Sequence, residues 1–430
     1  MSNLVEPRDE HDQLLLSRVH PSDYTNPTPD NPYNLVVVGA GAAGLVSAAG
    51  ASGLGARVAL VERALAGGDC LNYGCVPSKA LISAATAVAN VRAADSFGVH
   101  VEGSVAIDFP EAMARMRRLR AQISKVDSVE RFTELGVDVF IGQGMFTGPR
   151  SLNVEGAELR FSKAIIATGA RAAGLPIPGL EEAGYLTNET VFNLSELPGR
   201  LAVIGAGPVG CEMSQVFQRF GSRVTLLEVA PNILIREDAD AAEMVQGALL
   251  ADGVDLVTNI ENINRVSGSG GGRMVEFTRG GEARSIEVDA VLVAVGRVPN
   301  VDGLGLEAAG VEYHKRGVIV DDAYRTSNPR IYGAGDICSP YQFTHAADFM
   351  ARTVLTNALF PGRTKKGSAL TIPWCTYTDP QIAHVGMTEQ GAEKDGVSVS
   401  TFTVPMDDVD RAILDGETKG FVKIHVKAGT

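Results

Sequence analysis

Two cysteines, Cys70 and Cys75, lie five positions apart in the first fifth of the chain. Side chains this close can form a disulfide with little movement of the backbone. Pro77 and the alanine-rich run over 79–91 predict a helix that begins beneath them. A thiol at a helix N-terminus ionises easily, because the helix dipole and the unpaired amides favour a thiolate. The pair therefore predicts redox thiol chemistry.

A structural disulfide and a zinc site are two simpler explanations of the pair. A structural disulfide is disfavoured, since the chain has only five cysteines and its acidic N-terminus does not resemble a secretory signal. A zinc site needs about four ligands, and no second Cys or His pair has a matching spacing. Cys211 is expected to be a packed core residue, whereas Cys338 and Cys375 leave a secondary metal or thiol site open.

A glycine motif precedes the cysteines and would position them. The apolar run over 35–38 leads into Gly39-x-Gly41-x-x-Gly44, and small helix-forming residues follow. Gly39 permits a tight turn, Gly41 lets the backbone approach a pyrophosphate, and Gly44 lets the helix sit close to the strand. The next predicted strand ends in Glu62, where a carboxylate can accept ribose hydroxyls. This order predicts a dinucleotide-binding unit.

The same pattern occurs a second time. A strand over 200–204 enters Gly205-x-Gly207-x-x-Gly210, and a further strand ends in Glu228. The separation from the first glycine to the acid is the same in both copies. The sequence therefore predicts an α/β protein with two nucleotide-binding units of one design.

With these motifs in order, the chain after Asn34 resembles the pyridine nucleotide-disulfide oxidoreductases with a Cys-x-x-x-x-Cys centre. That family includes dihydrolipoamide dehydrogenase, glutathione reductase and mercuric reductase. Further matching segments lie at 164–170, 291–300 and 326–336. The resemblance implies two Rossmann-like FAD- and NAD(P)-binding domains, followed by a C-terminal α+β interface domain that looks truncated at Thr430.

The resemblance also implies roles for individual residues. Cys75 would contact the flavin as a thiolate, and Cys70 would exchange with substrate. Lys79 would lie near the flavin N5 and pair with Glu212. No resident metal is implied. The residues implied to contact FAD or the nicotinamide cofactor are Gly39, Gly41, Gly44, Glu62, Lys79, Gly144, Thr168, Gly169, Asp336, Gly205, Gly207, Gly210, Glu228 and Gly296.

Glu228 favours NADH over NADPH. A carboxylate there accepts both ribose hydroxyls of NADH and repels the extra phosphate of NADPH. Val229 offers no compensating cation, although Arg223 and Arg236 are close in sequence. Pro208 departs from relatives that carry a tyrosine gate over the nicotinamide pocket.

The expected organisation has four parts. Residues 1–33 are expected to form an extended arm, 34–160 and 320–360 the FAD-binding domain, 161–319 the NAD(P)-binding domain, and 366–430 an incomplete dimerisation domain. One helix is expected over about 108–135, and a hairpin tip over 268–272.

The interface domain of relatives supplies an acid-base histidine from a His-Pro-Thr segment, and nothing in this chain matches it. Exchange with an organic disulfide needs such a proton donor, whereas a thiophilic metal needs only thiolate ligands. The leading hypothesis is therefore a mercuric reductase-like enzyme that reduces Hg(II) or a small disulfide. Dihydrolipoyl dehydrogenase is the alternative that Glu228 favours, and a flavin-binding module inactivated by truncation is the third.

Composition limits the partners. The net charge of −13 argues against nucleic acid and anionic membranes. The most apolar stretch, 35–61, is interrupted by glycines and does not resemble a membrane span. These features, with the lack of a targeting segment, predict a cytoplasmic protein. The resemblance to the family implies a homodimer in the full-length form.

Overall fold

The computed structural model describes residues 5–269, 271–360, 362 and 364–429. The first unit is built on a seven-stranded sheet. Six of its strands follow the order β3-β2-β1-β6-β5-β4, and the seventh, β18, pairs with β6. Strands β1, β2, β3, β6 and β18 run parallel, and β4 and β5 extend the sheet as an antiparallel hairpin. The strands are β1 (Tyr33–Val38), β2 (Val58–Glu62), β3 (Val137–Ile141), β4 (Gly144–Gly148), β5 (Ser151–Val154), β6 (Ala157–Ile166) and β18 (Ile331–Gly333).

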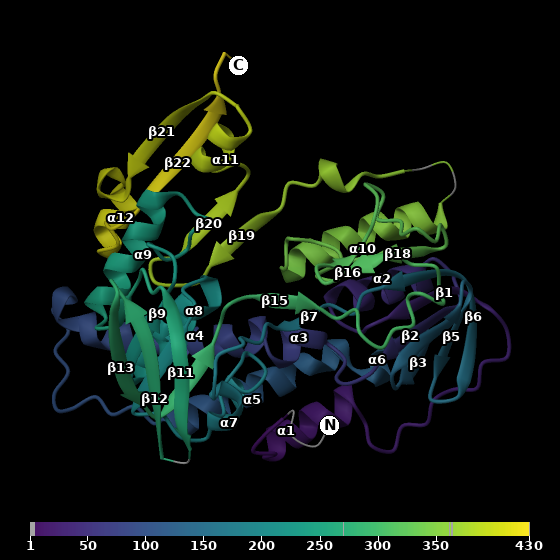
Figure 1. The fold of residues 1–430 in the computed structure, drawn as a ribbon, viewed down its shortest axis with the longest axis horizontal. Helices are drawn as coiled ribbons and strands as arrows, with labels where there is room; N and C mark the ends of the chain where they lie inside the picture. Colours follow the sequence, from purple (N-terminus) through teal and green to yellow (C-terminus); the bar gives the residue numbers. More distant parts are fainter. Residues whose placement is uncertain (1–4, 270, 361, 363, 430) are drawn as a thin grey trace.

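Two helices, α2 (Ala42–Gly53) and α10 (Thr344–Leu359), pack on each other and on one face of this sheet (Figure 1). Their small residues, Ala48, Ala51, Ala347 and Ala351 among them, are buried in the same core cluster as Leu35 and Val37. Small side chains allow this close packing, so the turn between β1 and α2 is fixed at the end of the sheet.

The second unit repeats the design with a parallel sheet of order β10-β9-β8-β14. A three-stranded antiparallel sheet, β11-β12-β13, packs beside it. The expected hairpin tip joins β11 to β12, with Gly268 opposite Arg273, while Gly270 lies outside the described residues. The elements are β8 (Arg200–Ile204), α8 (Pro208–Phe220), β9 (Arg223–Leu227), α9 (Ala239–Ala251), β10 (Asp255–Val257), β11 (Asn262–Ser269), β12 (Gly272–Arg279), β13 (Glu282–Val288) and β14 (Ala290–Val293).

The cysteine-bearing helices join the two units. Cys70 lies in the short helix α3 (Gly68–Asn72), and Cys75 is the first residue of α4 (Cys75–Ala93). Helix α4 packs against both α5 (Phe109–Ile123) and α8. Its buried Leu81 shares a core cluster with Phe217 of α8, so the redox segment is held between the two nucleotide-binding units.

Residues 366–429 form a third region of short strands, seen in yellow at one end of Figure 1. Strand β19 pairs with β20, and β21 pairs with β22, both in antiparallel register. The elements are β19 (Pro373–Thr376), β20 (Ile382–Val385), α11 (Glu389–Lys394), β21 (Val399–Pro405), α12 (Asp410–Asp415) and β22 (Phe421–Lys427).

The structure corrects three expectations about organisation. The N-terminal arm is not extended throughout, because residues 10–19 form helix α1 (Glu10–Val19) with Asp9 as its N-cap. The helix expected over 108–135 is interrupted: α5 passes into a 3₁₀ turn over 124–127, and Ser128 then caps α6 (Val129–Glu134). Local side-chain caps compete with helix continuation at such positions.

The expected domain limits also shift. The boundary at 160 falls inside β6, whose ten residues all belong to the first unit's sheet. The segment over 301–318, expected in the second unit, packs its buried Val301, Leu306 and Val311 against the first sheet. The crossing between units therefore lies at the paired strands β7 (Ala170–Ala172) and β15 (Arg297–Pro299).

The remaining elements are short connections: α7 (Leu180–Ala183), β16 (Tyr313–His314) and β17 (Gly317–Val318). Among the described residues, no helix combines the length and the apolar character that crossing a bilayer requires.

Candidate active site

A single cleft of about 2150 Å³ runs between the units, and it brings most of the predicted residues together. Both glycine turns, both cysteines, Lys79 and Glu212 line it. Its other predicted wall residues are Glu62, Thr168, Gly169, Glu228, Gly296 and Asp336. Segments that are far apart in the sequence thus form one continuous site.

The two glycine turns fit the shape that a dinucleotide requires. Gly39 and Gly205 adopt φ values of +105° and +101°, which favour glycine. A Cβ at Gly44 would lie 1.8 Å from the Gly39 carbonyl oxygen, so this glycine permits helix–strand contact. By contrast, a Cβ at Gly41 would have no atom nearer than 3.9 Å, and one at Gly207 none within 4 Å. These two positions leave the backbone open for a pyrophosphate.

The acids at the strand ends hold the turns in the same way in both units. The Glu62 carboxylate accepts hydrogen bonds from the amides of Ala40 and Ala64, each at 2.7 Å. Glu228 accepts from the amides of Ala206 and Ala230, at 2.6 and 2.8 Å. Burial raises the pKa of Glu62. Each carboxylate therefore sits where it can fix its turn and face the cleft.

The two cysteines are free thiols that face the same cleft. Cys75 Sγ lies 3.3 Å from Thr344 Oγ1, at the first residue of α10. A hydrogen bond with Cys70 lowers the pKa of Cys75 to about 6, and Thr344 and the charge of Lys79 act in the same direction against burial. The same bond raises the pKa of Cys70. The arrangement makes Cys75 the thiolate of the pair.

This asymmetry predicts a pH profile. The alkylation rate of Cys75 in the reduced enzyme should rise with pH through a midpoint near 6 and level off by about pH 8, because only the thiolate reacts. Iodoacetamide labelling at Cys75, followed by peptide mass spectrometry between pH 4.5 and 9.5, measures it. A rate that keeps rising to a midpoint near that of an ordinary thiol, about 8.5, contradicts the assignment.

Lys79 and Glu212 meet across the two units. Lys79 Nζ lies 2.9 Å from Glu212 Oε2, and the Glu212 side chain is only 4% exposed. Glu212 Oε1 also accepts from the Tyr377 amide at 2.8 Å, and Lys79 Nζ lies 4.4 Å from the centre of the Tyr377 ring. The carboxylate therefore fixes the ammonium group beside the cleft and ties β19 to α8.

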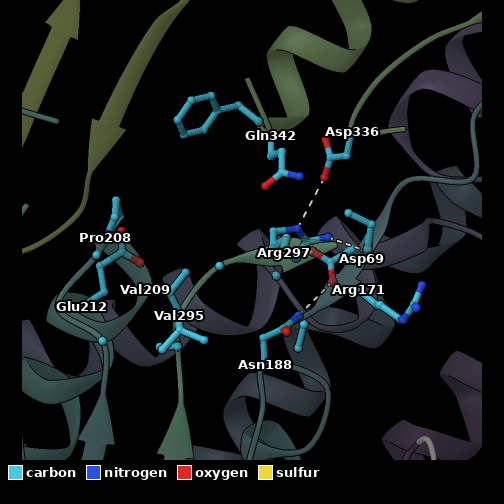
Figure 2. Close-up of a pocket in the computed structure, with 18 of the residues that line it drawn as sticks. Asp69, Arg171, Asn188, Pro208, Val209, Glu212, Val295, Arg297, Asp336 and Gln342 are labelled. Carbon is cyan, nitrogen blue, oxygen red and sulfur yellow. Dashed lines mark hydrogen bonds and ion pairs between the residues drawn. The ribbon is translucent and has the colours of Figure 1, made fainter. Parts of the chain in front are cut away.

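Sequence reasoning missed a cluster of charges next to Cys70. Arg297 Nη1 lies 3.0 Å from Asp69 Oδ2, and Arg297 Nε lies 3.5 Å from Asp336 Oδ2 (Figure 2). Asn188 Nδ2 donates to the other oxygen of Asp69 at 2.9 Å. Burial raises the pKa of Asp336, and Arg297 opposes the rise. Asp336 was predicted as a cofactor contact, whereas Asp69, Arg297 and Asn188 were not. The clues in the sequence were that Asp69 is adjacent to Cys70 and Arg297 to Gly296.

A second missed cluster joins the second unit to the third region. Trp374 Nε1 donates to Glu237 Oε1 at 2.5 Å, and His384 Nδ1 lies 2.8 Å from Glu237 Oε2. The Trp374 and His384 rings stack with centroids 4.0 Å apart. Burial lowers the pKa of His384, but the bonds to Glu237 and to the Gly386 carbonyl outweigh it and raise the pKa overall. No motif marks these residues in the sequence.

Three predicted contact residues lie outside the cleft. Gly44 and Gly210 make close helix–strand contacts instead, as expected of the third glycine in each motif. Gly144 was expected to contact a cofactor, but it lies in β4, where an added Cβ would meet Val61, Leu152 and Val38. Its small size serves sheet packing there.

The remaining cysteines and arginines singled out in the sequence lie in different parts of the structure. Cys211 is buried, as expected, and Cys375 lines the cleft. Within the described part of the chain, the one group with metal-ligand geometry is Asp238, Glu389 and His425, which includes no cysteine. Lys423 forms ion pairs with this group, so a cation already balances its charge. Arg223 begins β9, at the opposite end from Glu228, while Arg236 lines the cleft.

Comparison with known proteins agrees with this geometry. Residues 33–351 match the family "Pyridine nucleotide-disulphide oxidoreductase", and residues 372–430 match the dimerisation domain of that family. A mercuric reductase of Lysinibacillus sphaericus is 36% identical over 93% of this chain and 72% of its own length. A dihydrolipoyl dehydrogenase of Bacillus subtilis (strain 168) is 32% identical over 91% of this chain and 85% of its own. The chain spans 63% of the mercuric reductase of Bacillus cereus.

Solved structures show the same fold. The HOCl-induced flavoprotein disulfide reductase RclA of Escherichia coli, in a Cu(II) complex, has a TM-score of 0.80 at 30% identity, over 92% of this chain and 87% of its own. LpdA of Mycobacterium tuberculosis has a TM-score of 0.83 at 28% identity, over 92% and 88%. The chain belongs to the pyridine nucleotide-disulphide oxidoreductase family of FAD-dependent enzymes, within the mercuric reductase and lipoamide dehydrogenase group.

Proposed function

We propose that this enzyme passes two electrons from a reduced nicotinamide dinucleotide, through FAD and the Cys70/Cys75 pair, to a thiophilic metal ion such as Hg(II) or to a small disulfide. The observation that carries the proposal is the pair of free thiols, Cys70 and Cys75, in the same cleft as two dinucleotide-binding turns. The matched dimerisation domain supports a homodimer as the assembled form.

The cleft has the residues that would hold both cofactors. Gly39, Gly41 and Glu62 would bind the adenosine half of FAD, and Asp336 its ribityl chain. Gly205, Gly207 and Glu228 would bind the nicotinamide dinucleotide in the same manner, with Gly296 beside it. Bound FAD supplies two-electron exchange between a nicotinamide hydride and a disulfide.

The protein's own groups then carry the thiol steps. Lys79, fixed by Glu212, places a positive charge on the cleft wall, where it stabilises thiolate at Cys75. For a disulfide acceptor, Cys70 Sγ attacks one acceptor sulfur as its proton passes to the Cys75 thiolate, and the other acceptor sulfur leaves as a thiolate that takes up a proton from solvent. Cys75 then releases its proton to solvent and becomes a thiolate again. Cys75 thiolate then attacks Cys70 Sγ, which re-forms the Cys70–Cys75 disulfide and releases the second acceptor thiol. For Hg(II), the two sulfurs serve as ligands.

Hg(II) is the acceptor that we favour over an organic disulfide. Several similar relatives are named mercuric reductases, among them one of Lysinibacillus sphaericus and one of Staphylococcus aureus, each 36% identical to this chain. The test compares kcat/KM for Hg(II) in excess thiol, lipoamide and glutathione disulfide with one holoenzyme preparation. We expect Hg(II) to be favoured by at least ~10-fold over either disulfide, because two thiolate sulfurs are soft ligands that bind a soft metal ion strongly. Faster turnover of lipoamide would establish the dihydrolipoyl dehydrogenase alternative.

Glu228 predicts the nicotinamide preference. We expect the wild-type enzyme to use NADH better than NADPH, because the carboxylate repels a 2′-phosphate. Glu228→Gln removes the charge and keeps one of the two hydrogen bonds from the turn, because its amide oxygen can replace only one carboxylate oxygen. It should raise kcat/KM for NADPH relative to NADH by ~10-fold. Steady-state kinetics with both cofactors measure the ratio, and Val229→Ala is the matched control. An unchanged ratio in Glu228→Gln would remove Glu228 as the discriminating residue.

A further inference from the structure

The N-terminal helix α1 is part of the first unit's core. It packs against α5 and against the 3₁₀ turn over 124–127. Its Leu15 and Val19 are buried in one cluster with Phe132 of α6 and Leu71 of α3. Leu71 is the residue directly after Cys70, so the helix packs beneath the segment that carries the redox pair (Figure 1).

A buried chain of contacts runs from α1 to that segment. Asp12 Oδ1 lies 2.8 Å from Arg120 Nη2, and both side chains are 1% exposed. Arg120 Nη1 donates to the backbone carbonyl of Asn72 at 3.0 Å. Asn72 lies between the two cysteines, and its own side-chain amide donates to the carbonyls of Ala66 and Gly68. The turn from Cys70 to Cys75 is therefore held both from within and from α1.

A second ion pair at the same helix interface provides a comparison. Arg117 Nε pairs with Asp9 at 2.5 Å, and the Arg117 side chain is 8% exposed. Arg117 and Arg120 both lie on α5, and Asp9 and Asp12 both lie at the start of α1. Of these two arginines, only Arg120 has a described hydrogen bond to the 70–75 segment.

Stability alone does not account for the Asp12–Arg120 pair. The free-energy cost of desolvating two buried charges is about as large as the gain from their attraction. Replacing such a pair by apolar residues of similar volume therefore often leaves the stability of the fold unchanged. What apolar residues cannot supply is a charged donor to the Asn72 carbonyl. Asp12 keeps Arg120 charged and aimed at that oxygen.

We propose that Asp12 is a positioning residue for the redox pair: through Arg120 it fixes the Asn72 carbonyl, and so the hydrogen-bonding geometry of Cys70 and Cys75. The inference rests on the redox role proposed above for these cysteines. Without the contact, the 72–74 turn loses its hydrogen bond from Arg120 and keeps those made by the side chains of Asn72 and Asn188. The turn can then shift, and the Cys70–Cys75 hydrogen bond should weaken. That bond is the main cause of the low pKa of Cys75, so Cys75 should become less reactive near neutral pH.

The test uses the holoenzyme and three variants. Asp12→Asn removes the charge, and Asp9→Asn is the matched control on the same interface. Because Asp12→Asn leaves a buried arginine unpaired and is expected to be unstable, the double variant Asp12→Leu/Arg120→Met replaces the pair with apolar side chains. Each protein is reduced with dithiothreitol, and the pH profile of Cys75 alkylation is measured with urea unfolding in parallel.

We expect the alkylation midpoint to rise by at least about one pH unit in Asp12→Asn and in the double variant, which is ~10-fold slower labelling at pH 5.5. The double variant should be more stable than Asp12→Asn, but its alkylation midpoint should stay raised. If the ion pair served only stability, the midpoint would return to the wild-type value together with the stability. Asp9→Asn should keep the wild-type profile.

Two outcomes overturn the inference. One is a wild-type profile in the double variant, and the other is a shift in Asp9→Asn as large as that in Asp12→Asn. In both cases the low midpoint of the wild-type enzyme still supports the redox role of Cys75. A wild-type midpoint like that of an ordinary thiol would instead contradict that role itself, so the two failures are distinguishable.

Discussion

Replacing Cys75 by serine should lower turnover with every acceptor by at least ~10³-fold while NADH still reduces the bound flavin. Cys75 is the thiolate of the pair, held by Cys70, Thr344 and Lys79. A serine hydroxyl cannot form a disulfide with Cys70 or ligate a soft metal, so electrons have no route out of the flavin to these acceptors. Stopped-flow absorbance of flavin reduction and steady-state acceptor turnover separate the two half-reactions.

Cys338→Ser is the matched control for this prediction. Cys338 donates to the Gly335 carbonyl, as a serine can, and it is not among the residues that line the cleft. Its replacement should leave both half-reactions within about twofold of wild type. Substantial Hg(II) or disulfide turnover by Cys75→Ser would show that another group passes the electrons on, and the proposed function would fail.

Alanine at Gly44 should prevent folding, whereas alanine at Gly41 should give a folded protein that has lost FAD. The Cβ at Gly44 would lie 1.8 Å from the Gly39 carbonyl oxygen, a backbone atom fixed between β1 and α2. Relieving this overlap requires the helix to move off the sheet, which costs more than about 3 kcal/mol. Gly41 has a φ of −81° and open space at its Cβ, so alanine is tolerated by the fold itself.

Gly41→Ala should weaken FAD binding, because the alanine methyl group would occupy the place where the pyrophosphate of FAD meets the turn. The lost hydrogen bonds to a charged group predict at least ~100-fold weaker FAD affinity. Soluble yield, thermal unfolding and the flavin-to-protein absorbance ratio measure both effects. Tight FAD binding by Gly41→Ala, or normal stability of Gly44→Ala, would contradict the assigned roles of the two glycines.

Local pattern was enough to predict much of this fold. The apolar strands that lead into Gly39 and Gly205, and the glycine turns that follow, each lie within about thirty residues of sequence. Such short-range patterns can be recognised in a single sequence. The pairing of Lys79 with Glu212 spans 133 positions. It was reached only because both residues stand in motifs that resemble a known family.

What the sequence did not reveal depends on long-range packing. In the sequence, Asp12 is an ordinary acidic residue and Arg120 an ordinary basic one, because only the packing of α1 on α5 brings them together. The prolines of the N-terminal arm favoured an extended chain. The ion pair of Asp69 with Arg297 likewise joins residues 228 positions apart. Gly144, to which the resemblance assigns a cofactor contact, lies in β4, where an added Cβ would meet Val61, Leu152 and Val38, and this packing could not be read from the sequence.

The most direct test of the central claim, that Cys75 is a thiolate against the flavin, is an anaerobic titration of the purified holoenzyme with NADH. The account predicts a long-wavelength thiolate-to-flavin absorbance band after one equivalent, with two newly titratable thiols, and no such band in Cys75→Ser. Direct bleaching of the flavin by that first equivalent, without the band and without new thiols, would contradict it.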